Sequence, residues 1–307
     1  MGLGVLGASR LGRECAAIVR EPLDRWHRAT FARQPRFGAM SLVNDLWTYR
    51  GLIGNLAQRE LKGRYKRSVL GWLWSLLNPA STLAIYAVVF GTLLKVEPPV
   101  AGNGHTKSFA MFLFAGLVMW NFFNTVALGS MHSLIGAGPL LKKVYFPPEC
   151  APAANLVVAL SQVGIEAGIL LVLLVVVGNT SWSMLLVPVL IAMLAVFAFG
   201  IGLALSVANV FLRDVAYLVA VALNLLFYAT PIVYPDSLVK QNAPVWAQQL
   251  VAANPLNQFV KAMRACTYLS RWPSVGSLAI LAGTSAISFA CGWAIFRKFG
   301  ANVSEEL

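Results

Sequence analysis

The chain has 307 residues, of which 58% are hydrophobic and only 12% are charged. Ordinary soluble domains contain roughly 25% charged residues, so the composition predicts a membrane protein with several spans and excludes a disordered chain. The net charge of +12 does not indicate nucleic-acid binding in so apolar a sequence, and the four cysteines lie too far apart for a zinc or disulfide motif.

The N-terminal part divides into two segments. Residues 1–45 are basic and contain no apolar run of signal-peptide length, so we expect a mobile basic segment. Residues 46–68 place apolar and basic side chains on opposite sides of a helix, which predicts an amphipathic helix on the cytoplasmic membrane surface. Such a helix serves as a membrane anchor alone or also contacts a cytoplasmic partner. Its polar residues are Arg59, Glu60, Lys62, Arg64 and Lys66.

Charge-free windows predict six transmembrane helices within residues 69–298, because about 20 apolar residues are needed to cross a bilayer. We expect a kink at Pro79, near the start of the first span. Residues 178–181 form a polar turn, which explains Asn179 better than glycosylation does, and residues 299–307 form a tail. The expected spans lie near 70–94, 109–131, 153–177, 184–208, 215–234 and 275–296.

The distribution of basic residues predicts the orientation of these spans. The connections on the side that carries both termini hold 18 of the 24 Lys and Arg residues. Basic connections stay in the cytoplasm, so both termini should be cytoplasmic.

The connection before the last span, residues 236–271, is too polar to span and too apolar for a solvated loop. Two short helices on either side of Asn254-Pro255 fit this pattern. They form re-entrant helices in the outer leaflet, or alternatively a hairpin that rests on the surface.

Motifs for nucleotide or metal chemistry are absent. The sequence contains no P-loop, and its three histidines are scattered, so we expect neither an enzyme nor a cofactor site in this chain. Glu166 is the one ionisable residue well inside a span. It either contacts a polar substrate or protons, or it is a structural carboxyl group between helices, and the structural interpretation is favoured.

Several different short motifs lie along the chain. They are Arg59-Glu60-Leu61-Lys62, the segments 64–71, 74–79, 140–147, 211–215 and 230–234, and Asn254-Pro255-Leu256 with Arg264. Together they resemble the membrane subunit of ABC-2-type polysaccharide exporters over about residues 45–298. Pro148 departs from this family, which usually has Arg at that position, so the resemblance does not extend to an anion contact there.

The resemblance implies a homodimer in the plasma membrane of a bacterium, joined by two copies of a separate ATPase that binds ATP and Mg. It implies export of a lipid-linked polysaccharide, with actinobacterial galactan as the nearest substrate. It also implies that the 134–149 loop couples to the ATPase. The residues assigned to coupling are Leu140, Leu141, Lys142, Lys143, Val144, Tyr145, Phe146, Arg213 and Asp214.

Aromatic residues in three of the spans suit a glycan path, since sugar C–H faces pack on aromatic rings. Tyr86, Tyr228 and Tyr234 are the preferred candidates, and ordinary helix packing is the alternative for each ring. The assigned residues are Tyr86, Phe90, Trp120, Phe123, Glu166, Tyr228 and Tyr234.

Two other functions compete with ATP-driven export. An ion-driven flippase for lipid-linked glycans would use several intramembrane carboxylates and an inverted repeat, and only Glu166 meets the first requirement. A membrane-embedded glycosyltransferase would need acidic metal ligands on a cytoplasmic loop, where Glu149 and Asp214 are too few.

Overall fold

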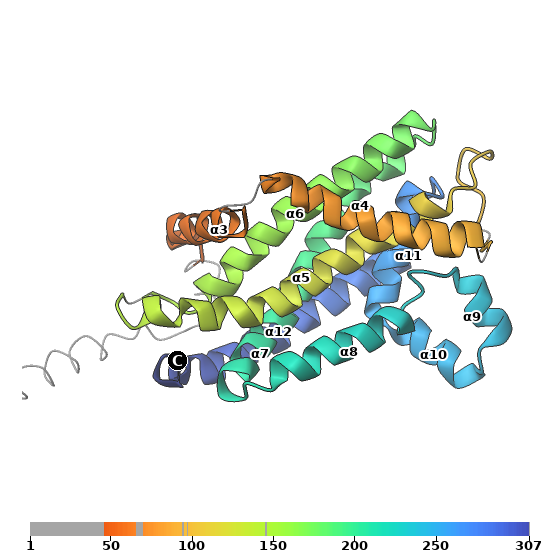
Figure 1. Cartoon of the computed structure of the whole chain (residues 1–307). Coiled ribbons are helices and arrows are strands. Elements are labelled where there is room, and N and C mark those ends of the chain that lie inside the picture. Colours follow the sequence, from red (N-terminus) through yellow and green to blue (C-terminus); the bar gives the residue numbers. More distant parts are fainter. Residues whose placement is uncertain (1–45, 66–69, 94, 97, 145, 307) are drawn as a thin grey trace, which may run out of the picture. The chain divides into compact units, whose positions relative to one another are not determined.

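The computed structural model describes residues 46–65, 70–93, 95–96, 98–144 and 146–306. Within these ranges the fold is all helical and has no strands, as the composition predicted (Figure 1). The expectation of a mobile segment at 1–45 lies outside the described residues. So do the positions of Lys66 and Tyr145, and the side chain of Arg64.

The described helices follow one another with short connections. Their bounds are α3 Arg50–Tyr65, η1 Gly71–Leu73, α4 Trp74–Tyr86, η2 Ala87–Leu93, α5 Phe109–Leu141, α6 Cys150–Val176, η3 Trp182–Leu186, α7 Val187–Phe211, α8 Val215–Ala229, α9 Asp236–Asn242, α10 Val245–Ala253, α11 Pro255–Thr267 and α12 Val275–Glu306.

Four of the described helical stretches are long and apolar enough to cross a membrane, where the sequence predicted six. They are Phe109–Leu141, Cys150–Val176, Trp182–Phe211 and Val275–Gly300. The other two expected spans correspond to shorter apolar helices. The region 71–93 is divided into η1, α4 and η2, and α8 ends at Ala229 because Pro231 follows and cannot continue the helical hydrogen bonds.

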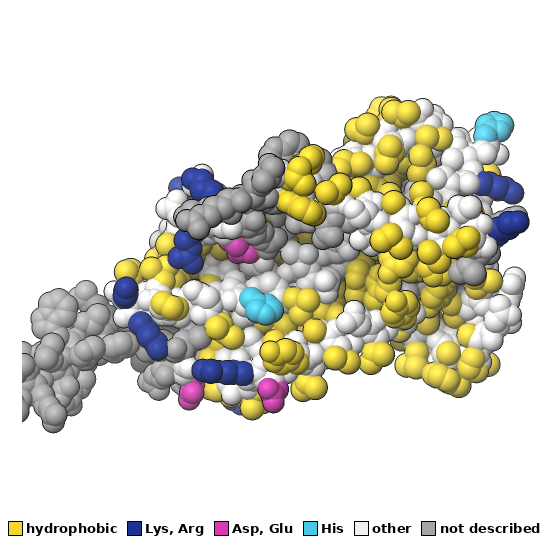
Figure 2. All heavy atoms as spheres, viewed as in Figure 1, with side chains coloured by type: hydrophobic (Ala, Val, Ile, Leu, Met, Phe, Trp, Pro, Cys, Tyr) yellow, Lys and Arg dark blue, Asp and Glu magenta, His cyan; other side chains and the backbone are white. Residues whose placement is uncertain are grey.

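Figure 2 shows hydrophobic side chains over the middle of the visible face and Lys and Arg side chains gathered toward its two ends. This separation is typical of helices that cross an apolar layer with charged connections on either side. The surface therefore agrees with the membrane class predicted from composition.

Helix α5 is at the centre of the fold. It is the most buried of the four candidate spans, and it packs against both α6 and α7. The sequence placed the end of this span near Met131, whereas the helix continues through Pro139 to Leu141. The expectation was wrong because a single proline removes only one helical hydrogen bond, and the following turn still closes with Lys142 N donating to Gly138 O at 3.1 Å.

Helices α7 and α12 approach each other closely along their lengths. A methyl group on Gly292 would overlap the carbonyl group of Gly200, so both backbones need glycine at this crossing. Two serine hydroxyls of α12 donate across the same interface, from Ser285 to Met193 O at 2.9 Å and from Ser288 to Phe197 O at 2.8 Å. Small residues thus allow contacts that aliphatic side chains would prevent.

Asn179 connects three loops at the opposite end of the fold from the α5–α6 turn. Its side chain is buried, accepts from Asn103 N at 3.0 Å, and donates to the carbonyls of Thr267 at 3.1 Å and Tyr268 at 2.9 Å. The polar-turn interpretation of residues 178–181 is therefore confirmed, because this amide is fully engaged inside the protein.

Helix α11 is buried within the helical bundle rather than lying on its surface. Leu256, Phe259, Val260 and Met263 are at most 4% exposed, and the helix packs against α5 and α7. The expected segment 236–271 contains three short helices instead of two. The surface-hairpin alternative is wrong for α11, whose apolar side supplies part of the core.

We predict that Gly292→Ala lowers the thermal midpoint of the detergent-purified protein by several degrees. The added methyl group must push α12 away from Gly200, and overpacking of this kind typically costs about 1–3 kcal/mol. Gly283→Ala on the same helix is the control, because a methyl group there meets no atom within 4 Å. Equal midpoints for the two variants would contradict the close crossing.

Candidate functional site

The structure brings most of the predicted path aromatics into one group, which we call the aromatic cluster. Phe227 of α8 lies at its centre, with ring centroids 6.2 Å from Tyr86, 5.3 Å from Trp120 and 5.2 Å from Tyr228. The cluster joins four elements, namely α4, η2, α5 and α8. Its members are Tyr86, Phe90, Trp120, Phe123, Phe227 and Tyr228.

The aromatic cluster extends from the core to the surface. Trp120, Phe123 and Phe227 are buried, Tyr86 is half-buried, and Tyr228 is 64% exposed. The exposed side of α8 continues this apolar surface. Its side chains, each at least 60% exposed, are Tyr217, Leu218, Val221, Leu225 and Tyr228. An exposed patch of this extent marks a surface for lipid, another protein or a ligand.

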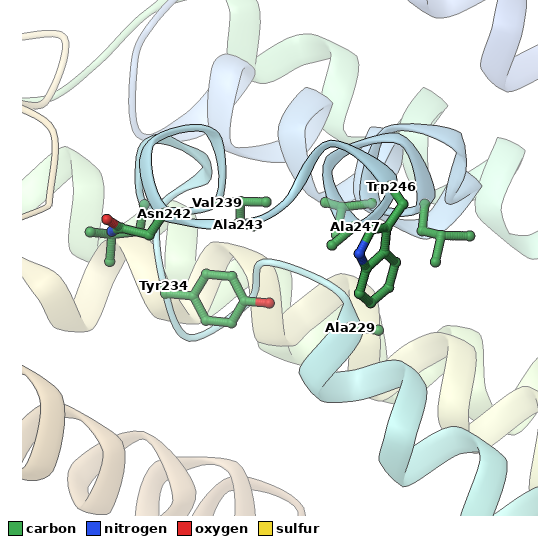
Figure 3. Close-up of a pocket in the computed structure, with 10 residues that line it drawn as sticks. Ala229, Tyr234, Val239, Asn242, Ala243, Trp246 and Ala247 are labelled. Carbon is green, nitrogen blue, oxygen red and sulfur yellow. The ribbon is translucent and has the colours of Figure 1, made fainter.

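Tyr234 lies just beyond α8 and serves two purposes. Its hydroxyl donates to Tyr228 O at 2.6 Å, which satisfies a carbonyl that the end of the helix leaves unpaired. Its ring lines a cavity of about 540 Å³, below the connection between Asn242 at the end of α9 and Trp246 of α10 in Figure 3. Tyr234 can therefore offer the cavity its ring face, while its O–H is already engaged.

This cavity, which we call the outer cavity, is mostly apolar. Asn242, Tyr234 and Trp246 supply its polar atoms, and its volume is within the ~300–1,000 Å³ typical of ligand pockets. The lining comes from the end of α8 and from α9 and α10. The lining residues are Ala229, Tyr234, Leu238, Val239, Asn242, Ala243, Trp246, Ala247, Leu250 and Val251.

Glu166 is separate from these aromatic contacts. It is 2% exposed on α6, where its Oε1 accepts from Gln162 Nε2 at 3.3 Å and its side chain also interacts with Asn121 of α5. The carboxyl group thus connects α6 to α5. These contacts fit the structural interpretation of Glu166 better than a position on the glycan path.

The predicted coupling residues lie near the α5–α6 turn, with different exposures. Lys142, Lys143 and Val144 are exposed, and Leu140 and Leu141 are half-buried in the last turn of α5. Phe146 is only 3% exposed and packs within this chain, so it is not part of the surface that the preceding residues form. Arg213 and Asp214 are exposed between α7 and α8.

Helix α3 packs on α6 through its apolar side. Ile53, Leu56 and Ala57 are buried, while Arg59 and Lys62 are exposed and Glu60 is half-buried. A helix is therefore present at Arg50–Tyr65, within the segment 46–68, and its buried residues face protein; its amphipathic position on the membrane surface stays a prediction.

The sequence missed the role of two buried polar residues, Asn179 and Arg264. Arg264 was noticed only as part of a motif and was counted with the outer basic residues, yet it is 4% exposed on α11. The sequence signal for this burial was available, because Arg264 lies on the same side of a helix as the apolar residues Phe259 and Met263. Among the described residues, no group of three His, Cys, Asp or Glu side chains is placed to hold a metal ion.

Comparisons with known proteins give the family. The profile of the ABC-2 type transporter family matches residues 52–268. The chain belongs to this family. The match begins within α3 and ends just after α11, so it includes the aromatic cluster, the outer cavity and Arg264.

Individual relatives align with this ABC-2 family member over most of both chains. The chain is 31% identical to the O-antigen export system permease protein RfbA of Myxococcus xanthus, over 87% of this chain and 99% of that protein. It is 29% identical to RfbA of Klebsiella pneumoniae, over 82% and 93% of the two chains. The polysialic acid transport protein KpsM of Escherichia coli is 25% identical, over 78% and 90%.

We predict that Glu166→Gln keeps normal protein yield and thermal midpoint, because a glutamine carbonyl can still accept from Gln162. Glu166→Leu should lower the midpoint, since it leaves the half-buried amide of Gln162 without its acceptor, and a lost hydrogen bond typically costs about 0.5–1.5 kcal/mol. Ile165→Leu, at the exposed neighbouring position, is the control. A Gln variant that melts normally but has lost transport would contradict the structural role.

Proposed function

We propose that this protein is the membrane-spanning permease subunit of an ATP-driven ABC transporter that exports a lipid-linked polysaccharide from the cytoplasm of a bacterium. The observation that carries the proposal is the similarity to an O-antigen export permease over 99% of that relative's length. The motif resemblance to actinobacterial exporters narrows the proposed substrate to cell-wall galactan.

In this proposal the permease works as a homodimer with two copies of a separate ATPase, which bind ATP and Mg. The sequence of this chain has no nucleotide-binding motif, which supports such a division of labour. The exposed apolar side of α8 supports a second copy beside it, because a patch of this kind needs lipid or protein against it.

The aromatic cluster and Tyr234 are the proposed glycan path. Aromatic faces pack against sugar C–H groups and provide orientation without charge, which suits a polymer that must move past each contact. Tyr86 and Tyr228 add hydroxyl groups at the exposed end of the cluster, where their phenol groups interact. Glu166 remains a weaker candidate for the path because its contacts join α5 and α6.

We further propose that the two short apolar helices complete six spans, with both termini in the cytoplasm. Helix α8 has 15 residues and is therefore about 22 Å long at 1.5 Å per residue, whereas the hydrocarbon core is ~30 Å thick. The non-helical segment 230–235 would occupy the remaining depth. Such a segment is tolerated in a membrane where protein covers it, and α11 provides that cover.

This topology predicts the labelling of single cysteines in intact cells, after Cys15, Cys150, Cys266 and Cys291 have been replaced. Cysteines at Gly104, Thr180 and Gln241 should react with a membrane-impermeant maleimide, whereas one at Lys143 should react only after the cells are lysed. All four positions are exposed in the structure, so the membrane alone decides the result. Labelling of position 143 from outside would end the six-span proposal.

The proposed coupling surface gives a functional test in proteoliposomes that contain the permease, its ATPase and the glycan. We predict that Lys142→Ala, Lys143→Ala and Val144→Ala in combination reduce ATPase recovery in pull-downs or export per ATP hydrolysed. The three exposed side chains would lose contact area and the charge that orients the partner.

The control is Lys107→Ala, which removes an exposed charge just before α5, at the opposite end of that helix from Lys142. It should leave both ATPase recovery and export per ATP normal. A triple variant with normal recovery and normal coupling would exclude this surface. Wild-type complex that hydrolyses ATP but does not export glycan would overturn the proposed function itself.

A further inference from the structure

Arg264 carries a permanent positive charge into the interior of the bundle. Its guanidinium group donates to three backbone carbonyls: Nε to Phe112 O at 3.2 Å, Nη1 to Pro231 O at 2.7 Å and Nη2 to Ile232 O at 2.5 Å. The planar guanidinium presents its donors in a fixed fork, so one side chain can join α11, α5 and the segment after α8. Burial of this charge is compensated by these hydrogen bonds.

Two residues of helix α5 accommodate this guanidinium group. The group lies over the ring of Phe112, 3.7 Å from its centroid, in a cation–π contact. Gly116, one turn further along α5, leaves the space beside it. A Cβ atom at residue 116 would lie 2.9 Å from Nη2 and 3.4 Å from Ile232 Cγ2.

The carbonyls of Pro231 and Ile232 belong to a segment that pairs little of its own backbone: Ile232 N donates to Thr230 O at 2.6 Å, but no described backbone N–H donates to Pro231 O or Ile232 O. Helix α8 has ended, and Pro231 and Pro235 have no N–H to donate. Buried carbonyls left without a donor destabilise the fold. Arg264 supplies the missing donors from the adjacent helix.

Two further contacts hold the same segment on α11 and its N-cap. Asn254 Nδ2 donates to Thr230 Oγ1 at 2.9 Å, and Lys261 Nζ lies 3.5 Å from Asp236 Oδ1. The segment is thus fixed at its start, its middle and its end. Tyr234 lies between these anchors, where it lines the outer cavity and donates to Tyr228 O.

We propose that Arg264 is a positioning residue for transport: it holds the segment 230–235, whose Tyr234 lines the outer cavity, and thereby sets the positions of Tyr228 and Tyr234 beside the exported glycan. The inference rests on the proposed export function. It assigns Arg264 no contact with the glycan, because the side chain is 4% exposed and its donors face backbone carbonyls.

The first test is hydrogen–deuterium exchange of the purified permease–ATPase complex without substrate. Arg264→Gln should raise amide exchange in residues 230–238 by at least about tenfold, because charged hydrogen bonds to that backbone are lost, and should leave α7 and α12 unchanged. Arg264→Lys should restore part of the protection, since an ammonium group reaches some of the carbonyls without the fork. Arg271→Gln, an exposed arginine just after α11, is the matched control.

The second test is export in proteoliposomes, expressed as glycan moved per ATP hydrolysed. Arg264→Gln should lower this ratio several-fold, Arg264→Lys should lower it less, and Arg271→Gln should match the wild type. A residue that only adds global stability would lower yield and thermal midpoint while leaving the ratio and the local exchange unchanged in the folded fraction. That result would overturn the proposal.

A second variant keeps the test decisive if Arg264→Gln does not fold. Gly116→Ala retains the arginine but displaces its guanidinium group, and it should raise exchange in 230–238 in the same direction. Gly136→Ala on the same helix is its control, because nothing lies within 4 Å of a methyl group there. Unchanged amide exchange in Gly116→Ala would refute the positioning role of Arg264. Failure of the wild-type complex to export glycan would instead refute the proposed function, and the exchange result would remain valid.

Discussion

The end of α8 leaves backbone carbonyls that the helix itself cannot pair, and the arrangement of this part of the protein follows from how they are satisfied. Thr230 Oγ1 donates to Leu226 O at 2.7 Å, and the hydroxyl of Tyr234 donates to Tyr228 O. The guanidinium group of Arg264 donates hydrogen bonds to the carbonyls of Pro231 and Ile232. An arginine can reach these groups only from a neighbouring helix, so α11 has to lie inside the bundle.

Glycine residues in the central helices allow the close contacts of this fold. Gly116 gives α5 the space for the guanidinium group, and Gly200 and Gly292 let α7 and α12 touch through their backbones. Van der Waals contact and interhelical hydrogen bonds stabilise helix pairs in a membrane, where burial from water contributes little. The serine hydroxyls of α12 are of this kind.

One side of the helical bundle, formed by α8, carries exposed apolar side chains. The exposed surface of α8 continues from the aromatic cluster, so the rings pass from tight packing around Phe227 to the surface at Tyr228. In the proposed homodimer this surface would face the glycan or the second copy. The segment held by Arg264 lies at its end, so in the proposed path the positions of the last aromatic rings depend on a charge that faces backbone carbonyls and not the glycan.

Composition and charge patterning determined the fold class and the positions of the four long apolar helices, because these depend on local hydrophobicity and on residue types alone. The tertiary structure decided which residues meet. The cluster around Phe227 requires four elements to converge. The donors that Arg264 provides lie 32 to 152 residues from their acceptors, a separation at which no local pattern specifies a partner.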